Sequence, residues 1–181
     1  MSDASTTALK RATGTALQVR ETPNEAWRDA DWQKLWLLLK SRSWTSLAII
    51  PAGAGAPADF TLTIAVTLAR IGILHLGTPI HVADGTNITL GRLEQFLEEV
   101  HRLNRDGDLV LIALPAIDEN PTAIALAQKA SFSVLCILLG VMSQSEAKRT
   151  IGRIGRTSFL GTAVFHPPAS AAENAASPAP R

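Results

Sequence analysis

The amino-acid sequence predicts an α/β fold, a three-layer αβα sandwich with a mostly parallel sheet of about five strands. Three observations support this expectation. Strand-like and helix-like segments alternate along the chain, as they do in proteins built from βαβ units. The strand-like segments are apolar at nearly every position, which indicates burial on both faces and therefore a parallel sheet. The composition, with 46% hydrophobic and 18% charged residues, is typical of a globular domain.

The order of the elements follows from periodicity and from capping residues. Asn24 can cap a first helix, Asn120 and Pro121 can begin a fourth, and Ser143 with Glu146 forms a capping-box signature for a fifth. Strands are expected at about residues 46–50, 78–82, 108–114, 133–141 and 158–166. Helices are expected at about residues 25–40, 59–70, 90–104, 121–130 and 143–154.

Composition also divides the chain. Residues 1–23 are rich in Ser, Thr and Ala and are expected to be flexible, residues 24–166 form one domain, and residues 167–181 read as a disordered Ala/Pro/Ser tail. The N-terminus lacks the apolar core of a secretory signal, and the most apolar stretch, 60–76, is short for a membrane span. A net charge of +1 gives no general attraction to nucleic acid. We therefore expect a cytoplasmic protein.

The predicted first helix carries an apolar face with tryptophans. Trp32, Leu35, Trp36 and Leu39 recur at helical spacing, and Trp27 lies just before them. One interpretation is that this face packs on the domain. The other is that it binds a partner, since tryptophan is favoured at protein interfaces.

A glycine-containing loop, "AGAGAPADFTL" at residues 52–62, connects the first strand to the second helix. This is where a phosphate-binding loop lies in nucleotide-binding α/β proteins. Such a loop uses glycines to bring backbone N–H groups close to the phosphate, a lysine to neutralise charge, and a Ser or Thr hydroxyl to hold Mg²⁺. Here the glycines, Gly53 and Gly55, stand without a lysine, and the only charged residue is Asp59.

Several segments together resemble a known family. The chain is similar to the P-loop ATPases of the ParA/MinD (SIMIBI) group, and within it to the bacterial tyrosine kinases (BY-kinases) of capsule and exopolysaccharide export. "EAWRDADWQKLWLLL" is similar to their opening helix "EAYRTLRTNL", and "IIPAGAGAPADFTLTIAVTLARIG" to their strand, phosphate loop and helix. "HVADGT" resembles their "LLIDAD", "DLVLIALPA" resembles "DYVIIDTPP", and "FLGTAVFH" resembles the closing strand "LGVVLN". The resemblance covers most of residues 24–166.

The departures from this family bear on the activity. The resemblance places the Walker lysine at Pro57, the Ser/Thr pair at Ala58 and Asp59, and the Walker B aspartate at Ala113. A like charge about 4 Å from Asp59 would cost on the order of 4 kcal/mol at an effective dielectric constant near 20. The chain has no tyrosine, whereas the kinases autophosphorylate a C-terminal tyrosine cluster, and it is shorter than the family between Asp84 and Asp108. The remnant of the nucleotide site then comprises Gly53, Gly55, Pro57, Ala58, Asp59, Asp84, Ala113 and Pro115.

These departures predict a chain that is not an enzyme and that binds neither ATP nor Mg²⁺ as a cofactor. The alternative for the loop is an ordinary Gly/Ala/Pro turn without such ancestry. Asp84, followed by Gly85, is either a retained site residue or part of a turn. Asp118 and Glu119 either face the crevice at the strand ends or belong to a solvated loop.

Other candidate sites are weaker. The histidines lack the spacing of helical metal ligands, so no metal site is expected, and Cys136 reads as a buried, inert thiol. A basic cluster on the last helix is either a solvated face or a contact for an acidic partner or the inner-membrane surface. The histidines are His75, His81, His101 and His166, and the cluster comprises Lys148, Arg149, Arg153 and Arg156.

The leading hypothesis is a non-catalytic scaffold of a bacterial exopolysaccharide synthesis or export machine, of capsule or cellulose type. The resemblance implies a partner in the cytoplasmic part of an inner-membrane export or synthase protein, recruitment to that membrane by the partner, and a potential for homo-oligomers. Nucleic acid is not an expected partner. Two alternatives stay open: an active ATPase with a divergent nucleotide site, and a degenerate ParA/MinD-like positioning or pilus-assembly protein.

Overall fold

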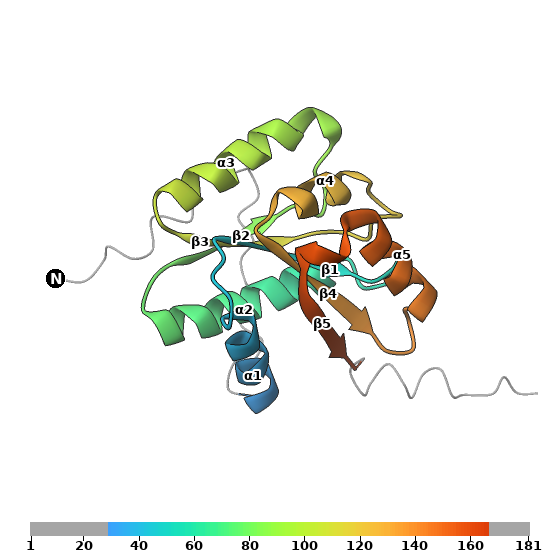
Figure 1. Ribbon diagram of the computed structural model, residues 1–181, viewed down its shortest axis with the longest axis horizontal. Helices are drawn as coiled ribbons and strands as arrows, with labels where there is room; N and C mark the ends of the chain where they lie inside the picture. The colour runs from blue at the N-terminus through green and yellow to red at the C-terminus, as the bar shows by residue number, and fades with distance from the viewer. Residues whose placement is uncertain (1–28, 167–181) are drawn as a thin grey trace, which may run out of the picture.

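The computed structural model describes residues 29–166, which form a five-stranded parallel sheet with the strand order β2-β3-β1-β4-β5 (Figure 1). Every neighbouring pair of strands is parallel, as the fully apolar strand segments predicted. The expected fold class is therefore confirmed. The strands are β1 (Ser46–Pro51), β2 (Ile80–Asp84), β3 (Leu109–Ala113), β4 (Phe132–Leu138) and β5 (Phe159–Phe165).

Helices cover both faces of the sheet. The residues of α1 (Ala30–Leu39) and α2 (Phe60–Leu76) share one core cluster with the sheet. The other face is covered by α3 (Leu93–Arg105), α4 (Thr122–Lys129) and α5 (Gln144–Ile154), so the molecule has three layers (Figure 1). Short 3₁₀ turns, η2 (Leu90–Arg92) and η3 (Arg156–Ser158), lead into α3 and β5.

Helix α2 and strand β2 differ from their expected bounds. The helix was expected to end near Arg70, but it continues to Leu76 and ends at Gly77, whose φ of +69° gives the left-handed cap that glycine favours. The residues after Arg70, for which the sequence predicts a turn, continue the helix, and β2 begins at Ile80 instead of Thr78. Gly72 lies inside α2 and does not break the helix. Its missing side chain leaves room for the ring of Trp36, which packs against it.

The start of α1 also differs. Asp29 has an extended backbone, and its carboxylate accepts a hydrogen bond of 2.7 Å from the N–H of Asp31, so Asp29 caps a helix that begins at Ala30. The expected Asn24 cap and Trp27 lie outside the described residues. The capping box before α5 is confirmed, because the Ser143 hydroxyl accepts from the Glu146 N–H and the Glu146 carboxylate accepts from the Ser143 N–H.

The tryptophan-bearing face of α1 packs against the domain. Trp36 is 1% exposed and Leu39 is 4% exposed, so these two residues belong to the core and the expectation that they bind a partner needs correction. Trp32 and Leu35 are half-buried against the same core, where Trp32 contacts the ring of Phe165. The physical reason is that Trp32, Leu35, Trp36 and Leu39 form the inward face of α1. The exposed apolar residues, Leu37 and Leu38, lie on its other side.

One further property concerns membranes. Among residues 29–166, no helix combines the length and the hydropathy that crossing a bilayer requires.

The contact between α1 and α2 provides a test of this packing. An alanine methyl group at Gly72 would lie 2.5 Å from Trp36 Cη2 and would also overlap Ile80 Cδ1. We expect Gly72→Ala to lower the free energy of unfolding by about 1–3 kcal/mol through overpacking. Gly152→Ala is the matched control, because this α5 glycine faces open space. The control should raise stability by up to about 1 kcal/mol through helix propensity. Urea unfolding measures both changes, and equal effects of the two substitutions would contradict the packing.

Candidate functional site

The candidate site lies at the carboxyl ends of β1 and β3. These strands are neighbours, with Ile49 opposite Ala113. The chain leaves β1 for α2 on one face of the sheet and leaves β3 for α4 on the other face. Because the two connections separate in opposite directions, a crevice opens between them. Open α/β sheets bind ligands at such switch points.

Both glycines of the loop are required, for different reasons. The side chain of Glu146 on α5 packs against Gly53, where a Cβ would lie 2.6 Å from Glu146 Cδ. Gly55 has a φ of +89°, a conformation that L-residues with side chains rarely adopt. The loop is also anchored at its start. The Ala52 N–H donates to the Cys136 carbonyl at 2.8 Å, and the Thr150 hydroxyl donates to the Ala52 carbonyl at 2.8 Å.

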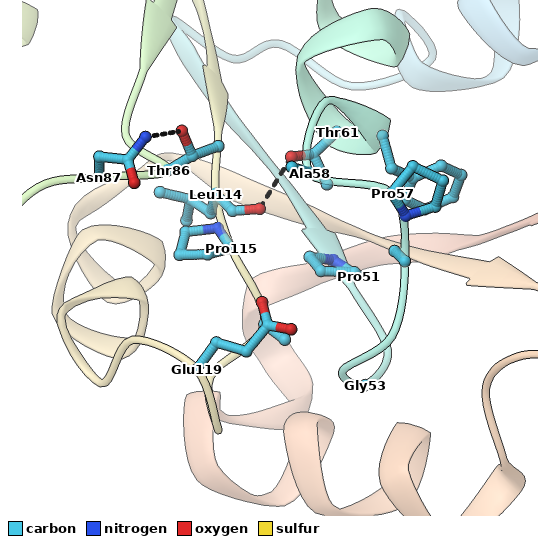
Figure 2. A pocket seen from close by; sticks show the side chains of 13 residues that line it. Pro51, Gly53, Pro57, Ala58, Thr61, Thr86, Asn87, Leu114, Pro115 and Glu119 are labelled. Atoms are coloured by element: carbon cyan, nitrogen blue, oxygen red, sulfur yellow. Dashed lines mark hydrogen bonds between the residues drawn. The ribbon is translucent and has the colours of Figure 1, made fainter.

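A buried threonine connects the two halves of the crevice. Thr61, in the first turn of α2, donates its hydroxyl to the Leu114 carbonyl at 2.9 Å (Figure 2). Thr61 is 4% exposed, so this hydroxyl serves to join α2 to the end of β3. Thr61 was not among the predicted site residues. The signal that could have found it is a hydroxyl residue in the first turn of the helix that follows the loop.

The crevice holds a small pocket with a volume of about 150 Å³. This is below the roughly 300–1,000 Å³ of typical small-molecule sites. None of the lining residues is a lysine, arginine or histidine, and one, Glu119, carries a carboxylate that points between Pro115 and Pro51 (Figure 2). The lining comprises Pro51, Gly53, Ala56, Pro57, Ala58, Phe60, Thr61, Thr86, Asn87, Leu114, Pro115, Ala116 and Glu119.

The structure brings part of the predicted remnant together. Gly53, Pro57, Ala58 and Pro115 all line the pocket. Gly55 and Asp59 belong to the same loop but are not among the lining residues, and Asp59 precedes α2 without a side-chain capping hydrogen bond. The predicted site did not include Thr86 and Asn87, which follow β2, although Thr86 ends the segment "HVADGT".

Asp84 and Ala113 lie beside the pocket, opposite each other in the β2–β3 register. The Asp84 carboxylate accepts hydrogen bonds from the N–H of Thr86 at 3.0 Å and from its hydroxyl at 2.6 Å. This arrangement is a local turn of the kind that aspartate forms with the backbone two residues on. Of the two interpretations of Asp84, the geometry matches the turn.

One carboxylate packs against the loop at Gly53. Hydrogen bonds from the hydroxyl and N–H of Ser143 lower the pKa of Glu146, so its carboxylate is ionised at neutral pH next to Gly53. Arg149, one turn further along α5, is held by Asp118 at 2.7 Å. The basic cluster therefore has one member paired with the loop after β3. The Glu146 carboxylate packs on Gly53 but is not among the residues that line the pocket.

The remaining candidate residues lie elsewhere. His81 contacts Asp108 at 2.8 Å near the amino ends of β2 and β3, at the edge of the sheet away from the crevice. His75 accepts a hydrogen bond of 3.2 Å from the Trp36 indole N–H. Cys136 is buried in β4. Across residues 29–166, no group of three or more His, Cys, Asp or Glu side chains is placed to hold a metal ion.

No protein-family profile and no curated protein sequence matches the chain. Several solved structures share its fold, including the following three. The kinase domain of the Escherichia coli tyrosine kinase ETK superposes with a TM-score of 0.61 at 14% identity, covering 84% of each chain. The chimerical protein CapA2B2 has a TM-score of 0.55 at 14% identity, covering 75% of this chain and 82% of that one. The BceF tyrosine kinase domain has a TM-score of 0.51 at 16% identity, covering 75% and 74%. The chain thus has the P-loop NTPase-like fold of tyrosine kinase domains.

The pKa of Glu146 predicts a pH dependence of stability. A carboxyl group whose pKa is lower in the folded than in the unfolded protein stabilises the fold at every pH above its unfolded pKa. This stabilisation is lost as the pH falls through the folded-state pKa. We expect Glu146→Gln to be less stable than the wild type at pH 7, with the difference shrinking below about pH 4.5. Thermal unfolding at several pH values measures it, with Glu98→Gln, on the exposed side of α3, as the control for loss of one charge. A difference that is independent of pH would contradict this assignment.

Burial of Cys136 predicts a protected thiol. Desolvation raises the pKa of this thiol far above its ordinary value, so the reactive thiolate is scarce and also inaccessible. We expect no labelling by a thiol reagent in native buffer and stoichiometric labelling in denaturant. Rapid labelling of the native protein would show that β4 is exposed.

Proposed function

We propose that this chain is a non-catalytic member of the P-loop NTPase-like fold, a pseudo-ATPase that acts by protein–protein contacts. The observation that carries the proposal is the charge of the loop. The pocket lining contains no cationic side chain, and the ionised carboxylate of Glu146 packs against Gly53.

The chemistry of phosphoryl transfer supports this proposal. Catalysis of that reaction is largely a matter of positioning the phosphate and neutralising its developing charge. Pro57 supplies neither a cation nor an N–H donor, Ala58 supplies no hydroxyl, and Ala113 supplies no carboxylate for Mg²⁺. The two buried threonine hydroxyls nearby are already in use, since Thr61 donates to the Leu114 carbonyl and Thr150 donates to the Ala52 carbonyl.

The biological setting of the proposal comes from the resemblance to the exopolysaccharide tyrosine kinases, which the shared fold with tyrosine kinase domains supports. The chain would serve as a pseudokinase scaffold in the cytoplasm, bound to the cytoplasmic part of an inner-membrane polysaccharide export or synthase protein. The neighbouring genes would distinguish this setting from a ParA/MinD-like role in positioning or pilus assembly.

A divergent ATPase is the second candidate, and the pocket itself is the observation that favours it. Backbone N–H groups of Ala54 to Ala56 and the start of α2 could still face an anion. Two contacts weigh against it. The Phe60 N–H already donates to the Pro57 carbonyl at 2.9 Å, and the Asp84 carboxylate is used by Thr86.

One variant separates the two candidates. Ala58 is exposed and lines the pocket, so Ala58→Glu adds a second carboxylate to the loop without disturbing the core. A scaffold tolerates this change, and we expect unchanged recovery of membrane or synthase partners in mild detergent and unchanged polysaccharide output. The matched control is Thr63→Glu, at an exposed position of α2. Loss of output with Ala58→Glu alone would contradict the scaffold.

The converse measurement addresses the ATPase directly. If the chain hydrolyses ATP, the rate should fall in Asp84→Ala, since Asp84 would serve as the Mg²⁺ ligand of such an enzyme. We expect no hydrolysis above background in either protein. Hydrolysis that is abolished by Asp84→Ala would establish the enzyme instead.

A further inference from the structure

Exposed apolar side chains gather where the end of α1 meets the end of α2. Nine large apolar residues are exposed in the part of the chain that the structure describes, and five of them lie in two short segments of these helices. Trp36 joins the segments, because its indole N–H donates to His75 at 3.2 Å and its ring packs against Gly72, so that α1 lies against α2 (Figure 1). The apolar patch comprises Leu37, Leu38, Ile73, Leu74 and Leu76.

The apolar patch is not an extension of the core. Leu38 is 70% exposed and Leu74 is 65% exposed, although Trp36 and Gly72 beside them are buried. A single exposed leucine is ordinary, but a group of large apolar side chains in one place marks a surface that meets a membrane or another protein. The patch therefore calls for a partner, and its surroundings indicate which one.

The charges around the apolar patch are almost all positive. Between Asp31 and Asp84 the chain has one acidic residue, Asp59, which lies at the opposite end of α2 from Leu74. The same span contains four cations, Lys34, Lys40, Arg42 and Arg70. Helices α1 and α2 thus present leucines and cations, with no carboxylate near the end of α2.

The cations closest to the leucines are available for a partner. The ion pairs within residues 29–166 use Lys34, His81, Arg102 and Arg149, and none of them uses Lys40, Arg42 or Arg70. Arg70 is exposed one turn before Leu74, on the same side of α2, and Arg42 is exposed just after the end of α1. Lys40 lies over the Trp44 ring, which leaves its charge uncompensated by an anion.

We propose that the apolar patch and its cations rest on an anionic lipid bilayer. The lipid phosphates attract Arg42 and Arg70, and the boundary between headgroups and acyl chains accepts the leucines. A nucleic acid would leave the leucines unused, and an apolar protein surface would leave the cations unused. This contact differs from recruitment by a membrane partner, and it does not depend on the crevice, which lies at the other end of α2.

Co-sedimentation of the full chain with vesicles tests the charge complementarity. We expect binding to phosphatidylcholine vesicles that contain one third phosphatidylglycerol, weaker binding as salt screens the charges, and little binding to phosphatidylcholine alone. Arg42→Gln with Arg70→Gln should weaken binding at least about tenfold. Arg153→Gln with Arg156→Gln, exposed at the end of α5, is the matched control. Absence of binding to the anionic vesicles, or a larger loss in the control, would overturn the proposal.

A second pair of variants tests the leucines. Leu38→Ser with Leu74→Ser should also weaken vesicle binding at least about tenfold, and both positions are exposed enough for the protein to fold. Leu90→Ser with Val164→Ser removes exposed apolar side chains outside the patch and should change binding little. Equal losses in the two double variants would overturn the proposal. So would a chain that is dimeric without lipid and monomeric in Leu38→Ser with Leu74→Ser, because a second copy would then cover the patch.

Discussion

Burial of β1 along its whole length is the constraint on which the rest of the molecule depends. All six of its residues are buried between β3 and β4. Leu47 and Ile49 enter the core shared with α1 and α2, whereas Ala48 and Ile50 enter the core shared with α3 and α4. Because parallel strands need crossover connections, this central strand forces the chain to leave its carboxyl end through the loop at residues 52–59. The position of the crevice is thus a consequence of the core.

The same position offers little to an anion. The fold presents a loop, a helix N-terminus and a crevice, which nucleotide-binding proteins use to hold phosphate. Here no lining residue is cationic: most are apolar, Thr61, Thr86 and Asn87 are polar and neutral, and Glu119 is acidic. The side chain of Glu146 packs directly on Gly53. The Thr61 hydroxyl joins α2 to the end of β3, and the Thr150 hydroxyl joins α5 to the start of the loop. The contacts of the loop are those of a structural connection.

The sequence predicted the layers of the fold well, because strands that are apolar on both faces leave few arrangements. The sequence also predicted the capping box of α5 correctly, because that motif depends only on residues three positions apart. It did not predict that Gly72 would lie inside α2, since its role as a contact surface for Trp36 depends on a helix remote in sequence. For the site, the order of residues along the chain predicted correctly that four of them lie together: Gly53, Pro57, Ala58 and Pro115. The sequence did not predict that the carboxylate of Glu146 lies beside this loop, because only the packing of α5 brings it there.

The most direct test of the central claim is a calorimetric titration of the purified chain with ATP and with ADP in the presence of Mg²⁺. The account predicts no binding up to millimolar nucleotide, because the loop has no cation and faces the Glu146 carboxylate. Binding in the low-micromolar range would contradict it, and would show that backbone N–H groups alone hold the phosphates.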